Sequence, residues 1–93
     1  MNPKRDKVSI MRDILLLIRG QGGEAGPTHI MYKANLSHQM LTEYIKELLE
    51  KRLIAENTAK KGGRRTYSIS GKGHEFLKDY ETIRKFLDSY GLA

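Results

Sequence analysis

Apolar residues recur at helical spacing near the start of the chain. In residues 6–19 they form two adjacent stripes, which together predict a helix with a wide buried face. The first stripe consists of Val8, Met11, Leu15 and Ile18, and the second of Ile10, Ile14 and Leu17. A glycine-rich run at 20–26 then interrupts the pattern. This run predicts a flexible connector that ends at Pro27, a residue that suits the first turn of a helix.

Two further amphipathic segments follow the connector. Residues 28–34 predict a short helix with Ile30 and Met31 directed inward. Residues 38–52 predict a longer helix with one apolar face. That face consists of Leu41, Tyr44, Ile45, Leu48 and Leu49. The polar face opposite is left free to contact a partner.

The three residues between these segments favour a tight turn. Asn35 tolerates the left-handed backbone conformation, and Leu36 can enter the core from the turn. Ser37 is a residue type that commonly caps a helix N-terminus. Helix, turn and helix in this order predict a helix-turn-helix unit.

A β-hairpin is predicted next. The runs 53–57 and 66–69 are rich in residues that favour strands, and the pair Gly62-Gly63 between them allows the positive φ of a tight reversal. A helix-turn-helix followed by a two-stranded hairpin is the element order of a winged helix. The predicted fold is therefore α+β and mostly helical.

The last predicted helix, over 74–90, carries an apolar stripe with coiled-coil spacing. The stripe consists of Phe76, Tyr80, Ile83, Leu87 and Tyr90, and Leu77 and Phe86 widen it. The stripe either packs on the first helix or pairs with a second copy of the chain, and we favour a homodimer interface. The predicted organisation is a winged helix with a basic N-terminal arm over 1–73 and a dimerisation helix over 74–93.

Composition narrows the class of protein. The chain has 93 residues, a formal net charge of +6 and no cysteine, which fits one domain in a reducing compartment. Its longest apolar run is five residues, Ile14 to Ile18, and its start lacks a signal-peptide layout, so we expect an intracellular protein without a membrane partner. The three histidines lack the neighbours of a metal site or a catalytic triad, so no enzyme, cofactor or small-molecule substrate is expected.

The positive charge lies in two clusters. Lys4, Arg5 and Lys7 form one cluster at the N-terminus. This segment is either an arm that becomes ordered on DNA or a tail without a role. The predicted hairpin carries the other, made of Lys60, Lys61, Arg64 and Arg65 with no acidic residue between them. Such clustering is typical of nucleic-acid contact, although a solvated loop is the simpler alternative.

The start of the 38–52 helix carries candidate base-reading residues. His38 lies one residue past the predicted cap, Gln39 can bind adenine in a bidentate manner, and Thr42 can contact a phosphate or a thymine methyl group. Each is also an ordinary exposed helix residue. Further predicted DNA contacts are Lys33, Ser37 and Lys46. Glu43 on the same face favours some sequence selectivity, whereas Tyr32, Tyr44 and Tyr67 are expected in the core or at its edge.

Three blocks of the sequence resemble a known family. Residues 28–37, 47–54 and 67–77 are similar to the small archaeal winged-helix DNA-binding proteins of the 10a type, over about 8–90 of the chain. The resemblance implies a basic dimer with an antiparallel coiled coil of C-terminal helices and a winged helix at each end. Two features depart from the family pattern: the connector is rich in glycine, and position 38 is His38 where the family pattern would have an aromatic residue.

These observations favour a homodimer that binds double-stranded DNA, with a chromatin or nucleoid role in the cytoplasm and limited sequence selectivity. A sequence-specific regulator of transcription is the close alternative. A winged helix that binds an acidic protein surface is the alternative from another class.

Overall fold

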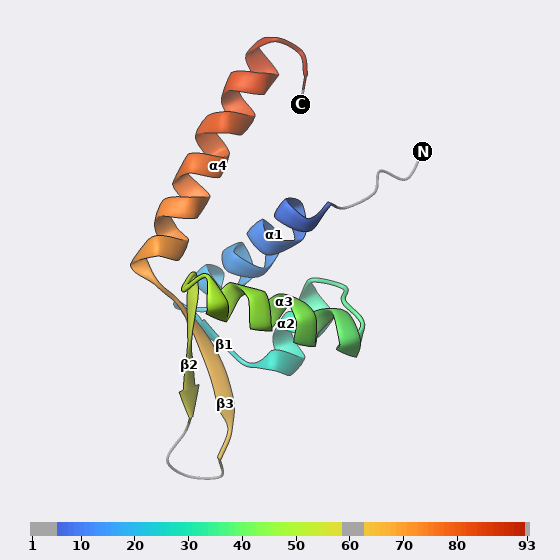
Figure 1. Ribbon diagram of the computed structural model, residues 1–93, viewed down its shortest axis with the longest axis vertical. Coiled ribbons are helices and arrows are strands. Elements are labelled where there is room, and N and C mark those ends of the chain that lie inside the picture. Colours follow the sequence, from blue (N-terminus) through green and yellow to red (C-terminus); the bar gives the residue numbers. More distant parts are fainter. Residues whose placement is uncertain (1–5, 59–62, 93) are drawn as a thin grey trace.

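The computed structural model describes residues 6–58 and 63–92, and its central element is the first helix, α1 (Figure 1). These described residues form, in chain order, α1 (Lys7–Gly20), β1 (Glu24–Ala25), α2 (Pro27–Lys33), α3 (His38–Glu50), β2 (Ile54–Thr58), β3 (Arg65–Ile69) and α4 (Gly71–Ser89). This order confirms the predicted winged helix. Among the described residues, no helix is long and apolar enough to cross a lipid bilayer.

Helix α1 supplies the centre of the core, as its two apolar stripes predict. The side chains of Ile14, Leu15 and Ile18 are fully buried. Asp6 caps the helix, and its carboxylate accepts a hydrogen bond of 2.7 Å from the Ser9 amide. Val8 differs from the prediction because 47% of it is exposed, at an open groove beside the helix start.

The turn between α2 and α3 has the predicted conformation. Asn35 is left-handed with a φ of 56°, and Leu36 is buried. The Ser37 hydroxyl accepts a hydrogen bond of 3.1 Å from the Met40 amide, which confirms it as the cap of α3. Helix α3 ends earlier than predicted because Arg52 is left-handed with a φ of 60°, which turns the chain into the hairpin.

The sheet contains a strand that the sequence did not predict. Its order is β1-β3-β2, and both pairings are antiparallel. In β1, Glu24 pairs with Ser68 and Ala25 with Tyr67, so the predicted flexible connector is partly ordered on the edge of the hairpin. A two-residue strand is too short to show an alternating pattern, and its partner lies more than 40 residues away.

Helix α4 begins at Gly71, three residues before the predicted start. Ser70 caps it by accepting a hydrogen bond of 3.0 Å from the Gly73 amide, and it donates one of 2.7 Å to the Arg52 carbonyl. The first two turns belong to the core through the buried Leu77. The middle of α4 lies against α1, and its C-terminal turns project from the body on the side opposite to the β2–β3 hairpin (Figure 1).

Candidate nucleic-acid interface

The polar face of α3 is exposed, as predicted. The exposed residues are His38, Gln39, Thr42, Glu43 and Lys46. Two hydrogen bonds connect them within the helix: the Gln39 amide donates to Glu43 at 3.3 Å, and the Thr42 hydroxyl donates to the His38 carbonyl at 3.0 Å. Gln39 and Thr42 therefore each form a hydrogen bond within α3.

An open groove of about 620 Å³ brings this face together with the hairpin. Helix α3 contributes His38, Thr42 and Lys46 to its lining. The hairpin contributes Glu56 and Arg65, and the apolar floor includes the ring of Tyr67. The fold thus places predicted base-reading residues and a predicted phosphate-binding residue around one cleft.

The described part of the hairpin presents its cations at the end farthest from the core. Arg64 is exposed, and Gly63 beside it has a φ of 61°, which supports the chain reversal. The Arg65 Nε lies 3.0 Å from a Glu56 carboxylate oxygen, and 61% of the Arg65 side chain remains exposed. Lys60 and Lys61 lie outside the described residues.

The other predicted contacts are not gathered at this groove. Lys4 and Arg5 lie outside the described residues. Lys7 begins α1, and its Nζ lies 2.6 Å from a carboxylate oxygen of Glu47 on α3. This hydrogen bond lowers the pKa of the Glu47 carboxyl and raises that of Lys7. Lys33 is exposed at the end of α2 and lines a different hollow.

Two residues differ from what the sequence indicated. Tyr32 was expected in the core or at its edge, but 76% of it is exposed, because the two-turn helix α2 directs only Ile30 fully inward. Tyr44 and Tyr67 are half-buried and buried, as expected. Glu56 was not singled out, although acidic residues near a predicted basic strand are candidates for pairing across a hairpin.

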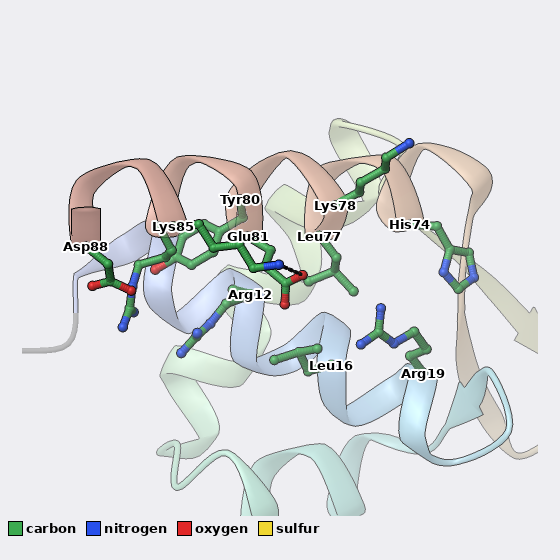
Figure 2. A pocket seen from close by; sticks show the side chains of 11 residues that line it. Arg12, Leu16, Arg19, His74, Leu77, Lys78, Tyr80, Glu81, Lys85 and Asp88 are labelled. Carbon is green, nitrogen blue, oxygen red and sulfur yellow. Dashed lines mark ion pairs between the residues drawn. The ribbon is translucent and has the colours of Figure 1, made fainter. Parts of the chain in front are cut away.

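A second groove, of about 520 Å³, separates α1 from α4. Figure 2 shows Arg12 on α1 next to Tyr80 on α4, and Leu16 on α1 below Leu77 on α4. The Arg12 guanidinium lies 5.0 Å from the centre of the Tyr80 ring, and the Tyr80 hydroxyl lies 3.4 Å from that of Ser9. These contacts hold the middle of α4 against α1. Helix α4, which lines this groove together with α1, lies on the side of α1 away from α3 (Figure 1).

The stripe on α4 is divided between two environments. Phe76 is half-buried against the core and Tyr80 packs on α1, so the first part of the stripe packs within the chain. Ile83 and Tyr90 are 59% and 67% exposed, and the Phe86 and Tyr90 rings contact edge to face at 5.2 Å between centroids. Apart from the half-buried Leu87, the second part of the stripe is an exposed apolar surface on the distal part of α4.

The family model for winged helix-turn-helix proteins matches residues 4–88. The chain belongs to the winged helix-turn-helix family. No curated protein matches its sequence at a significant level.

Several solved structures share this winged helix. Sso10a-2, a DNA-binding protein from Sulfolobus solfataricus, is 26% identical with a TM-score of 0.73, over 94% of this chain and 90% of that one. A mutant of Lactococcus lactis ZitR is 26% identical with a TM-score of 0.70, over 89% and 57%. The structure of Staphylococcus aureus MepR in complex with DNA is 13% identical with a TM-score of 0.68, over 86% and 58%. This chain therefore spans less than two thirds of the ZitR and MepR chains.

Proposed function

We propose that the protein binds double-stranded DNA, with α3 in the major groove and the hairpin as a wing on the flanking backbone. The observation that carries this proposal is the shared groove between the polar face of α3 and Arg65 of the hairpin. An α-helix fits the major groove, and arginine is well suited to phosphate contact. The similarity to Sso10a-2, described as a DNA-binding protein, supports the same reading.

We infer that the affinity for DNA depends mainly on contacts with the phosphate backbone and that sequence selectivity is limited, as suits a chromatin or nucleoid protein. The Gln39 amide is bonded to Glu43 and the Thr42 hydroxyl to the His38 carbonyl. To read bases, these two side chains would have to exchange their hydrogen bonds within α3 for hydrogen bonds to base edges. A sequence-specific regulator of transcription remains the second candidate, because MepR is described as a transcription regulator.

A salt titration of binding tests the proposal. If about six phosphates are neutralised per winged helix, log affinity should fall against log salt with a slope near −5, and about twice that for a dimer on two sites. The titration should compare a random duplex with the DNA upstream of the protein's own gene. Equal affinities support the chromatin role, and a preference of about 100-fold or more supports the regulator. A slope near −1 to −2 would contradict the proposed footprint, and binding to an acidic protein but to no duplex would favour the protein-interaction alternative.

We also propose that the protein is a homodimer through α4, with the two helices antiparallel. The distal part of α4 exposes Ile83, Phe86 and Tyr90. At the base of the same helix an apolar groove lies beside Val8 and Phe76. In an antiparallel pair the distal end of each helix covers the basal groove of the other, whereas a parallel pair leaves both grooves open. The resemblance to the 10a family implies the same orientation.

Charged residues in the stripe should abolish this dimer. We expect Ile83→Lys with Leu87→Lys to be monomeric, because two ammonium groups would be buried without partners. Thr82→Lys is a matched control, since Thr82 is exposed and its hydroxyl donates a hydrogen bond to the Lys78 carbonyl of its own helix. Light scattering after size-exclusion chromatography measures the mass, and a monomeric natural protein would refute the dimer.

A further inference from the structure

The outer face of the sheet carries a polar network that spans all three strands. Glu24 on β1 accepts hydrogen bonds from the Thr66 hydroxyl on β3 and, at 3.5 Å, from the Asn57 amide on β2. The Asn57 amide also donates to the Ser68 hydroxyl at 3.0 Å. One carboxylate on the short edge strand therefore contacts both strands of the wing.

Strand β1 is well placed to act as the fixed end of this network. The Gly23 amide donates to the Ile18 carbonyl at the end of α1 at 3.0 Å, and the Gly23 carbonyl accepts from the Ile69 amide at 3.1 Å. Ala25 beside Glu24 is buried in the core. The backbone of Glu24 is thus tied to α1 and to the base of the hairpin.

The Glu24 side chain reaches farther along the wing than its backbone does. Among the described residues, β1 pairs with Tyr67 and Ser68 of β3 and not with the residues nearer the tip of the hairpin. Asn57 and Thr66 form the next pair towards the tip, and only the pair Thr58 and Arg65 lies beyond them among the described residues. The carboxylate therefore holds the wing next to the arginines that are proposed to contact phosphate.

We propose that Glu24 is a positioning residue that sets the angle of the wing relative to α3. This inference rests on the proposed DNA binding. On the inner face the ion pair between Glu56 and Arg65 joins the same two wing strands, but it does not connect them to the core. Within the described part of the hairpin, Glu24 makes this connection on the outer face. In the proposed complex it would also place a negative charge close to the DNA backbone.

Because of that negative charge, a charge effect and a positioning effect of Glu24 would change DNA affinity in opposite directions when the residue is replaced. If Glu24 acted only through its charge, its removal would strengthen DNA binding, because the repulsion of phosphates would decrease. If Glu24 positions the wing, Glu24→Ala should weaken binding by about threefold to tenfold, since charge-assisted hydrogen bonds to two strands are lost. Glu24→Gln keeps an acceptor oxygen and loses the charge, so it should bind as tightly as the natural protein or more tightly.

The experiment measures the affinity of the full chain for a random duplex across a salt series. Glu24→Ala should also decrease the magnitude of the salt slope by about one, because a displaced wing engages fewer phosphates. Thr66→Val removes the donor without a change in charge and should weaken binding similarly. The double variant should be no weaker than either single one, since both disrupt the same contact. Glu75→Ala, which removes an exposed carboxylate from α4, is the charge control and should leave the slope unchanged.

The outcomes separate this inference from the proposed function. Circular dichroism and the thermal midpoint of each variant show whether the fold is retained. Tighter binding by Glu24→Ala, or equal weakening by Glu24→Gln and Glu24→Ala, would overturn the positioning role while DNA binding stands. If the natural protein shifts no duplex at low salt, the proposed function fails first.

Discussion

Replacement of Gly73 by alanine is expected to destabilise the fold by about 2–3 kcal/mol. A Cβ at Gly73 would lie 2.4 Å from the Leu53 carbonyl oxygen and 2.7 Å from the Ile69 Cγ1. The first contact is with backbone, so it can be relieved only if α4 moves away from the base of the hairpin. Such a movement would also disturb the Ser70 hydroxyl, which joins the start of α4 to the Arg52 carbonyl.

Gly71 supplies the matched control for this prediction. It is the first residue of the same helix, and a Cβ there would meet no atom within 4 Å. Gly71→Ala should therefore be neutral or stabilising by up to about 1 kcal/mol, because alanine restricts the unfolded chain. Urea unfolding with unchanged m-values measures both free energies of unfolding. Equal stabilities of the two variants would show that α4 does not approach the hairpin as described.

The second large effect is expected from the wing. Arg64→Ala with Arg65→Ala should weaken DNA binding by on the order of 50-fold per winged helix at about 0.1 M salt. This is the loss expected when the counterions of two phosphates are no longer released on binding. The magnitude of the salt slope should decrease by about two, and the loss should be the same for all sequences. Fluorescence anisotropy with random and selected duplexes measures both quantities.

A control variant with the same loss of charge is available on α4. Lys78 and Lys85 are exposed and line the groove between α1 and α4 (Figure 2), and α4 runs away from α3 and the wing (Figure 1). Lys78→Ala with Lys85→Ala should decrease the affinity for DNA only slightly, because it lowers the net positive charge of the protein without removing a proposed phosphate contact. An equal loss in both double variants would mean that the wing makes no local contact. A loss confined to one duplex would mean that the wing reads bases.

The helices and the helix-turn-helix were predictable because their signals are local. The stripes of α1 and α3 repeat at helical spacing, and Asn35 and Ser37 have backbone and capping preferences that act within a few residues. The exposed face of α3 followed from the same periodicity. The hairpin was predictable for a similar reason, since its two strands adjoin a glycine pair.

The features that could not be predicted depend on contacts between distant segments. Strand β1 exists because Glu24 and Ala25 meet β3, and two residues carry no periodic signal. Gly73 lies inside α4, where glycine normally disfavours a helix, because the Leu53 carbonyl occupies the space of a side chain. The pairing of Arg65 with Glu56 depends on the register of the hairpin.

The sequence by itself determined the order of the four helices and of the two wing strands, the core stripes, the polar face of α3 and the location of the basic clusters, because periodicity and charge are properties of neighbouring residues. Only the tertiary structure decided that α3 and the wing share one groove, that Glu24 contacts both wing strands, and that the distal part of α4 exposes Ile83, Phe86 and Tyr90. Each of these features depends on which segments that are far apart in the sequence come into contact, so it depends on how the whole chain packs and not on the preferences of neighbouring residues.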